Sequence, residues 1–530
     1  MSKRSSKLIS IVMVVLMLAG MLVGCGGDKV ATATTTPAPA SAAASAQPTA
    51  APGTEAKLDE VTLRIYFPTE KRSATDEVWT AVAAMVKDRI NAKFEISFIP
   101  FNDYTDKLMV MASSGDNYDM NFDGNWLSYP KMVNAQAYLP LNDLLPKYAP
   151  ATYAALQKAG SLAAATVNGD LLAIPWEMHM NQQKLFLRWR NDLAGAAGLT
   201  YAKDSIKTIE DLDKFLHDAK AAIPADVKVW SWDAAENSPQ TMLMVNRDEL
   251  VDLNFHSIVF DVNDPNCKLI ALEQTPGYLE AAGYTKKWVD DGIIPKNLMV
   301  DKEQASAAFR NGTLFAALST HEWANADPGF ADKAWTMGTS ETYADKKAPN
   351  RSALANITCI NRNAANPERA LMFLDLLTTD QAVYDLVMYG IKDKTYVLNG
   401  EGADFPAGMT AANSSYLDWQ GQWAWWKPQF MRPTSTYPKG FWQAEATFAS
   451  QPQCVENKLD GLFFNTDAIK NEIAKRDQIN TEYGKLIQYG TVDDVNKAVA
   501  EYIQKQKDAG LDKILAELQR QVDEYLASKK

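Results

Sequence analysis

The sequence predicts an α/β protein in which one chain forms two lobes and ends in helices. Strand-like and helix-like segments alternate between residues 61 and 122, which is typical of a parallel sheet flanked by helices. Roughly 470 residues follow the N-terminal leader and linker, which is more than one hydrophobic core usually holds. We therefore expect two lobes or domains.

The alternating pattern has a regular β-α-β-α-β order. The expected strands and helices, in chain order, lie at residues 61–66, 75–91, 94–99, 103–114 and 118–122. Ligands of parallel sheets bind beyond the C-terminal ends of the strands. Asp123, Asn125 and Trp126 follow the third strand and therefore form a candidate site.

The rest of the chain mixes short strands with helices. We expect a turn and strand at 168–176, helices at 209–221 and 278–291, a strand at 313–319, and a C-terminal helix with apolar positions over 511–526. The apolar face of that last helix indicates packing onto a lobe, and a partner-binding helix is the alternative.

The N-terminal residues resemble a bacterial lipoprotein signal peptide. Three basic residues precede an apolar run over 8–23, which is shorter than the roughly 20 residues that span a bilayer. Such a run is typical of an exported, cleaved leader. LVGC, residues 22–25, resembles the lipobox, whose cysteine is lipidated. We predict a signal peptide at 1–24 and lipidation of Cys25; an ordinary signal peptide with a chance cysteine is the alternative.

Residues 25–57 are expected to form a lipid-anchored, disordered linker. Between residues 30 and 54 the chain consists almost wholly of Ala, Thr, Pro, Ser and Gln, which cannot form a core. A lipid anchor followed by a flexible linker predicts that the globular part lies at the extracellular face of the cell membrane.

The composition excludes several classes of partner and cofactor. Removing residues 1–24 removes three basic side chains and no acidic ones, so the formal charge falls from −12 to −15. Such a chain is not expected to bind nucleic acid or anionic lipid headgroups. Cys267, Cys359 and Cys454 lie far apart without CxxC spacing, and the histidines show no metal-binding pattern. We expect buried thiols, at most one disulfide, no metal and no cofactor.

Several stretches resemble the extracellular solute-binding proteins of ABC importers, in particular the large sugar-binding class that includes maltodextrin-binding protein. Segments similar to that class are DYTDKLMVMASSGDNYDMNF (103–122), NGDLLAIPW (168–176), AFRNGTLFAALSTHEW (308–323) and ITCINRNAANPERALMFLDLLTTDQA (357–382). VYDLVMYGIKDKTYVL (383–398) and the tail beginning GLFFNTDAIKNEIA (461–474) are similar to an LplA-like lipoprotein subgroup found chiefly in Gram-positive bacteria. The order and number of these matches, over most of residues 58–528, carry the resemblance.

The resemblance implies a two-lobe, periplasmic-binding-protein-like fold of type II, with the ligand cleft between the lobes and a hinge that closes around the ligand. Carried over, lobe 1 would comprise 58–175 and 353–398, and lobe 2 would comprise 176–352 and 399–530. The closed form would dock as a monomer on a membrane permease. No segment resembles a Walker A loop, so ATP would be hydrolysed by other subunits.

The tryptophans point to a sugar ligand independently of the resemblance. A pyranose has a face of C–H groups that an indole covers and a rim of hydroxyls that Asp, Asn, Glu, Gln and Arg bind. Trp stands beside such residues repeatedly at expected loop positions. The candidate ligand residues are Trp126, Trp323, Trp176, Asn125, Asp123, Glu177, Glu322, Arg188, Trp230, Trp232, Trp425 and Trp426.

Each candidate also has a structural alternative. Trp230 and Trp232 alternate like a strand with one buried face, and the tryptophans between 419 and 426 could seal a helix against a lobe. For the polar candidates the alternative is ordinary solvation at the surface. The sequence leaves these alternatives open.

We therefore expect an oligosaccharide-binding lipoprotein of an ABC importer, and not an enzyme. A peptide-binding protein is the first alternative, because an extended cleft with aromatic and charged side chains also suits peptides. A tethered glycoside hydrolase is less favoured. It would need two carboxylates about 5–10 Å apart across a cleft, which the sequence does not exclude.

Overall fold

The computed structural model describes most of the chain after the predicted linker. The described residues are 58–175, 177, 185–232, 238–253, 255–301, 305–319, 335–350, 352–410, 413–417, 425–433 and 451–529. Leu58–Lys530 forms one compact unit. Over the described ranges, no helix combines the length and the apolar character needed to cross a membrane.

The first sheet contains the predicted parallel strands. β1 (Val61–Phe67) pairs in parallel with both β2 (Ala92–Phe98) and β3 (Met120–Asp123), and the strand order is β14-β3-β1-β2. Helices connect the strands, so the predicted β-α-β-α-β order is confirmed. The connecting helices are α1 (Thr75–Ile90) and α2 (Phe101–Ser114).

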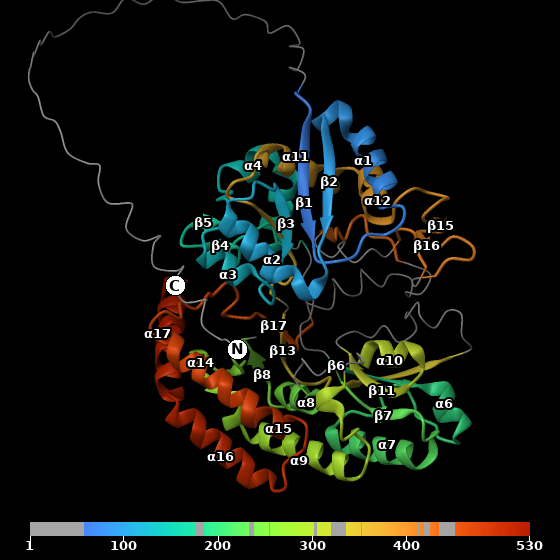
Figure 1. The fold of residues 1–530 in the computed structure, drawn as a ribbon, viewed down its shortest axis with the longest axis vertical. Helices are drawn as coiled ribbons and strands as arrows, with labels where there is room; N and C mark the ends of the chain where they lie inside the picture. Colours follow the sequence, from blue (N-terminus) through green and yellow to red (C-terminus); the bar gives the residue numbers. More distant parts are fainter. Residues whose placement is uncertain are drawn as a thin grey trace, which may run out of the picture. The chain divides into compact units, whose positions relative to one another are not determined.

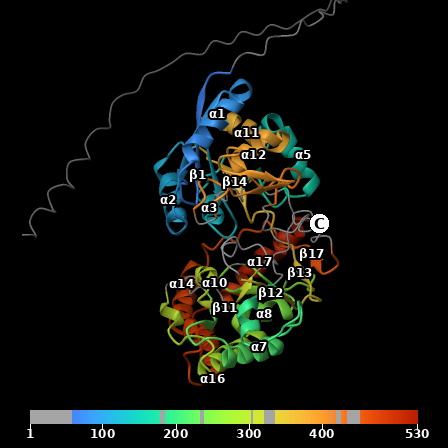
Figure 2. The same ribbon diagram turned by 90° about the vertical axis from the view of Figure 1, so that its right-hand side faces the viewer.

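One strand of this sheet was not predicted as a member. β14 (Ile357–Ile360) joins β3 in antiparallel register. Figure 2 shows β14 in the same part of the fold as β1, although β14 comes from much later in the chain. Ile174 also forms a bridge with Thr358 of β14. The chain therefore returns to the first sheet after a long excursion.

The first core is built on the alternation of β1 and on helical spacing. Leu63, Ile65 and Phe67 point inward because successive strand side chains alternate between the two faces of a sheet. Helices from two parts of the chain cover this core, with α1 beside α12 (Figure 1). They include α4 (Leu144–Tyr148), α5 (Pro150–Ala159), α11 (Pro367–Thr379) and α12 (Gln381–Tyr389).

A second core forms around a mixed sheet of order β12-β6-β11-β7. β6 (Leu185–Arg190) pairs antiparallel with β11 (Leu314–Ser319) and β12 (Met337–Thr342), whereas β7 (Lys228–Trp230) is parallel to β11. α7 (Ile209–Ala222) begins at a capping box between Thr208 and Asp211, which satisfies backbone N–H groups at its first turn. α8 (Pro239–Arg247) and α9 (Pro276–Asp290) also pack in this part of the chain.

A third core joins a small sheet to the C-terminal helices. The sheet comprises β8 (Leu250–Asp252), β9 (Ile258–Asp261) and β10 (Ile270–Ala271), and α14 (Lys470–Ile479) packs against α17 (Leu511–Ser528). The predicted apolar face of the last helix is confirmed as a packing face. Its buried residues are Leu511, Ile514, Leu518 and Val522.

The remaining helices and strands are short or peripheral. Among the described residues they are α3 (Tyr129–Asn134), β4 (Thr166–Val167), β5 (Asp170–Leu171), α6 (Asn191–Ala196), the 3-10 helices η1 (Leu272–Gln274) and η2 (Leu298–Val300), α10 (Ala305–Asn311), β13 (Ala348–Pro349), β15 (Val397–Asn399), β16 (Gly402–Asp404), β17 (Cys454–Val455), the π-helical η5 (Asn480–Gly484), α15 (Lys485–Gln488) and α16 (Val495–Asp508).

The first core extends further along the chain than the predicted end of lobe 1 at residue 398. Ala403, Tyr416, Leu417 and Trp425 are all buried in it. No sequence pattern indicates this packing, because an apolar residue packs equally well against either core until the path of the chain is known. These four residues thus pack with residues that the resemblance assigned to lobe 1, not lobe 2.

The thiols behave largely as expected. Cys267 and Cys359 are buried, and Cys454 is partly buried. Burial raises the pKa of both Cys267 and Cys359, so these thiols stay protonated near neutral pH. We found no cluster of His, Cys, Asp and Glu side chains that could hold a metal among the described residues.

Candidate ligand-binding site

The carboxyl end of β3 carries a buried carboxylate. Asp123 Oδ1 accepts hydrogen bonds from the Gly124 N–H (2.8 Å), the Ser128 N–H (2.9 Å) and the Ser128 hydroxyl (3.1 Å). The Tyr138 hydroxyl donates to Oδ2. Asp123 is fully buried, so it shapes the loop and presents no oxygen at the surface, which differs from the expected contact with a sugar hydroxyl.

Burial also changes the acidity of this carboxyl group. Loss of solvation raises the pKa of Asp123 to about 6, against the lowering effect of the hydrogen bonds from Tyr138, Gly124 and Ser128. Asp123 is therefore mostly ionised at neutral pH and becomes protonated in mildly acidic solution.

The loop after Asp123 is tied to the turn that precedes β14. The Asn125 N–H donates to Leu354 O (2.9 Å), and the Trp126 indole N–H donates to Ala355 O. A Cβ at Gly124 would lie 2.7 Å from Ala355 O and from Trp126 Nε1, so this close approach requires glycine. Trp126 is held at its N–H edge while the residue remains 38% exposed. The combination of a fixed edge and an exposed surface suits a stacking platform.

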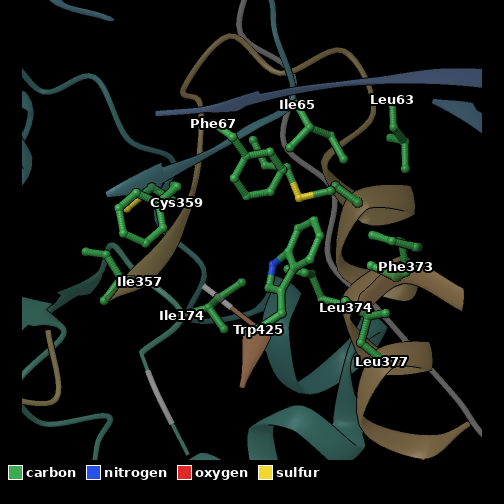
Figure 3. Close-up of a cluster of buried hydrophobic side chains, with 14 of the residues drawn as sticks. Leu63, Ile65, Phe67, Ile174, Ile357, Cys359, Phe373, Leu374, Leu377 and Trp425 are labelled. Atoms are coloured by element: carbon green, nitrogen blue, oxygen red, sulfur yellow. The ribbon is translucent and has the colours of Figure 1, made fainter. Parts of the chain in front are cut away.

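Trp425 is a core residue. It is 3% exposed, and its indole meets the ring of Phe67 edge to face at 4.9 Å between centroids (Figure 3). The indole N–H donates to Thr358 Oγ1 of β14 at 3.1 Å. No indole face is available for stacking, which corrects the expectation that Trp425 contacts ligand.

The two residues after Trp425 also contact the first core or residues next to it. Trp426 is partly buried against that core. The Lys427 ammonium pairs with the Glu177 carboxylate, and the two side chains are only 9% and 6% exposed. Glu177 thus has a buried structural partner rather than an exposed carboxylate, which differs from the expected contact with a sugar hydroxyl.

The strand-borne candidates of the second sheet are also largely internal. Trp230 is fully buried and meets Trp288 edge to face at 6.4 Å. Trp232 is 4% exposed and stacks on Tyr489 with 5.8 Å between ring centroids. These placements correspond to the core alternative that the sequence left open for both tryptophans.

Arg188 lies on β6, where its neighbours in the sheet are Ala317 and Thr339. Its side chain is partly buried, and the guanidinium carbon lies 5.1 Å from the centroid of the Phe309 ring. This cation–π contact holds the guanidinium against α10.

The remaining candidates lie outside the described residues. They are Trp176, Glu322, Trp323 and the lipidation residue Cys25. Of the described candidates, the structure brings Asn125 and Trp126 together in the loop that directly follows Asp123, the last residue of β3. It places Glu177, Trp425 and Trp426 around β14 and the helices of the first core. Arg188, Trp230 and Trp232 belong to the second sheet or the segment that follows it.

Sequence reasoning missed the partners that organise these residues. Tyr138 and the carbonyls of Leu354 and Ala355 hold the Trp126 loop, and Lys427 neutralises Glu177. No local pattern marks these residues, because each contact joins segments that are distant in the sequence.

Two sheet-based cores in one chain, with an indole held at the carboxyl end of the first sheet, are the arrangement expected of a two-lobe solute-binding protein. The chain belongs to the family of bacterial extracellular solute-binding proteins, whose model matches residues 72–392. A second model, described as a domain of unknown function (DUF3502), matches residues 458–527. The expected family membership is thus confirmed.

The known proteins that are similar to this chain match it over most of their length. A carbohydrate ABC transporter substrate-binding protein of Streptococcus pneumoniae serotype 4 is 25% identical over 493 residues, which cover 89% of this chain and 92% of that protein. The crystal structure of the N-glycan transport solute binding protein (NgtS) from Streptococcus pneumoniae matches with a TM-score of 0.74 at 23% identity, covering 88% of this chain and 100% of that chain. The complex of NgtS with Man5GlcNAc matches with a TM-score of 0.65 at 22% identity, covering 88% and 99%. The predicted two-lobe α/β fold is therefore confirmed.

Proposed function

We propose that this protein is the substrate-binding component of an ABC importer and that it captures an oligosaccharide between its two lobes. The observation that carries the proposal is Trp126, whose half-exposed indole is fixed by a hydrogen bond at one edge. A ring held in this way covers the C–H face of a pyranose without losing much side-chain entropy on binding.

The relatives support a carbohydrate over other solutes. One is named a carbohydrate ABC transporter substrate-binding protein, and NgtS was solved with Man1GlcNAc and with Man5GlcNAc. The matches cover nearly the whole length of both relatives, so the similarity extends over the whole two-lobe unit. We therefore favour a neutral oligosaccharide of the N-glycan type as the first ligand to test.

We propose that the ligand contacts come from both lobes. Asn125 and Trp126 would act from the first lobe, with Trp426 as a further aromatic contact, and Arg188 would act from the second. Trp176, Glu322 and Trp323 remain proposed contacts from the sequence. The buried residues Asp123, Glu177, Trp230, Trp232 and Trp425 would act indirectly, by fixing the backbone that carries the contacts.

The location and partner follow from the same proposal. Lipidation of Cys25 would anchor the protein at the extracellular face of the membrane, with residues 25–57 as the linker. The ligand-bound monomer would dock on a membrane permease, and ATP would be hydrolysed by separate subunits. The lobes would be 58–175 with 353–398, extended by the segment that packs around Trp425, and 176–352 with the C-terminal helices.

A thermal-shift screen tests the proposal. The chain from residue 26 onward retains the compact unit that begins at Leu58, and it would be screened against neutral oligosaccharides, acidic oligosaccharides and peptides. A ligand at 100 times its Kd adds roughly 2.7 kcal/mol to the free energy of unfolding, which raises the melting temperature measurably. We expect Man5GlcNAc or a related neutral glycan to raise it.

Two results would contradict the proposal. A shift with peptides and with no glycan would identify a peptide-binding protein. Release of smaller sugars from the bound glycan, followed by chromatography, would identify a glycoside hydrolase. Recovery of the intact glycan after heating the complex supports capture without cleavage.

A further inference from the structure

We infer that the C-terminal segment at residues 458–527 is a positioning element of the ligand site, because it fixes the turn at 352–355 that holds the Trp126 indole. The inference rests on the proposed function in one respect, namely that Trp126 contacts the ligand. It gives a role to the part of the chain that matches a domain of unknown function.

The contact begins at a carboxylate of this segment. Asp460, between β17 and α14, accepts a hydrogen bond from the Ser352 hydroxyl and another from the Ala353 N–H at 3.1 Å. Ser352 is 5% exposed, so water competes little for these bonds. Hydrogen bonds to an ionised acceptor are about twice as strong as neutral ones. Asp460 therefore fixes both a side chain and the backbone of the turn.

The turn at 352–355 also holds the loop that carries Asn125 and Trp126 (the site loop). Ser352 Oγ accepts from the Leu354 N–H at 3.1 Å, and Ser352 O accepts from the Ala355 N–H at 3.0 Å. The carbonyls of Leu354 and Ala355 then accept the hydrogen bonds from the Asn125 N–H and the Trp126 indole. Both acceptors of the site loop thus belong to the turn that Asp460 binds.

Asp460 is itself held by the end of α17. The Tyr525 hydroxyl donates to Asp460 O, and Lys529 Nζ lies 3.4 Å from the same oxygen. The Tyr525 ring packs against the third core, whose buried residues include Leu518 and Val522 of α17. The last helix therefore fixes the backbone position of the carboxylate.

A second contact joins the same segment to the first core. Phe463 meets Tyr129 edge to face at 5.3 Å, and Tyr129 begins the helix that follows the site loop. The neighbours of Phe463, Leu462 and Phe464, pack against the third core instead. Gly461 has a φ of +86°, and a Cβ there would lie 2.8 Å from Ala164 Cα. Residues 460–464 thus connect two cores at the base of the Trp126 loop.

The indole N–H of Trp126 provides a direct readout. In protein labelled with 15N-tryptophan, its resonance is assigned by its loss in Trp126→Phe. We expect Asp460→Asn to shift this resonance and to speed its exchange with solvent about fivefold, because one acceptor of the turn is replaced by a donor. Tyr525→Phe, which removes a single hydroxyl, should shift it in the same direction by a smaller amount. Asp467→Asn is the matched control, since Asp467 is exposed on the same segment.

Ligand affinity separates this inference from the proposed function. For Man5GlcNAc we expect Asp460→Asn to weaken binding about fivefold, and to have no further effect in the Trp126→Phe background. If Asp460→Asn and Tyr525→Phe both fold and both leave the Trp126 resonance unchanged, the inference is overturned, whichever ligand the protein binds. A shifted resonance in a protein whose unsubstituted form binds no glycan would contradict the proposed function and leave the positioning contact intact.

Discussion

The Lys427 ammonium and the Glu177 carboxylate form an ion pair in which both side chains are almost fully buried. The pair joins a segment beyond residue 425 to the end of the first core. The Lys427 N–H donates to the Tyr384 hydroxyl of α12, and the Thr378 hydroxyl of α11 lies 3.4 Å from Glu177 Oε1. The pair therefore links the point at Glu177, where the chain leaves the first core, to the point at Lys427, where a later segment packs against it.

Breaking this pair should destabilise the protein strongly. We expect Lys427→Met to lower the free energy of unfolding by about 3–5 kcal/mol, because Glu177 would lose its ion-pair partner in a buried site. Urea denaturation gives the measurement. The double variant Glu177→Gln with Lys427→Met should lose less than the sum of the single variants, and additive losses would contradict a coupled pair.

The exposed pair of Lys71 and Asp76 is the matched control. Its side chains are 54% and 80% exposed, so Lys71→Met should change the free energy of unfolding by less than about 1 kcal/mol.

Asp123 should make stability depend on pH in mildly acidic solution. The folded protein binds a proton near pH 6 and the unfolded chain near pH 4, so between these values the folded state binds more protons. Stability from this group is therefore present below about pH 4 and is lost as the pH rises to about 6, by about 3 kcal/mol in total. Asp123→Asn should remove that slope, as measured by denaturation at a series of pH values.

The tyrosines and the thiol around Asp123 titrate above this range, whereas burial also raises the pKa of Asp119, so Asp119→Asn is measured beside Asp123→Asn. Burial raises the pKa of Tyr138, Tyr118, Tyr129 and Tyr104 above the usual tyrosine value, and it raises the pKa of Cys359. Asp467→Asn, at an exposed position, should leave the pH slope unchanged. A slope that persists in Asp123→Asn would assign it to another group.

Trp126 should matter for binding more than for stability. Trp126→Ala should weaken binding of a glycan identified in the thermal-shift screen about tenfold, through loss of the stacked face. Calorimetric titration measures this effect. Leu398→Ala is a suitable control because Leu398 is exposed to a similar extent, 39%. Equal affinity in Trp126→Ala and the unsubstituted protein would remove Trp126 from the site.

Trp425 should show the opposite pattern. Trp425→Ala removes a ring packed among Phe67, Trp79 and Phe373, and should cost about 3–5 kcal/mol of unfolding free energy. Trp425→Phe should cost less, because it retains most of the apolar contact and loses the hydrogen bond to Thr358. A cost below about 1 kcal/mol for Trp425→Ala, in chemical denaturation, would contradict a core role.

Local patterns were sufficient for much of the fold. The alternation of residues 61–66 and the helical spacing after Thr75 predicted β1 and α1 close to their observed bounds, and the C-terminal apolar face packs as expected. The same patterns could not assign β14 to the first sheet. Pairing between distant strands depends on the path of the chain, and no period within a segment records that path.

For the candidate site, too, the sequence predicted some features and left others undecided. Sequence placed Asn125 and Trp126 in a loop at a strand end, where the structure has them, because strand ends in parallel sheets are predictable. Asp123, expected in the same loop, is instead the last residue of β3. It could not separate Trp126 from Trp425, since both are indoles beside polar residues. Burial distinguishes them, at 38% and 3% exposed, and burial is a property of the assembled core.

The sequence by itself determined the α/β class, the order of the first strands and helices, and the family resemblance, because these depend on periodicity and on local motifs. Only the tertiary structure decided that Asp123 is a buried acceptor, that Glu177 pairs with Lys427, and that Asp460 binds the turn beneath Trp126. Each of these contacts joins residues whose separation in space is set by packing, and a carboxylate has no fixed role until its neighbours are in place.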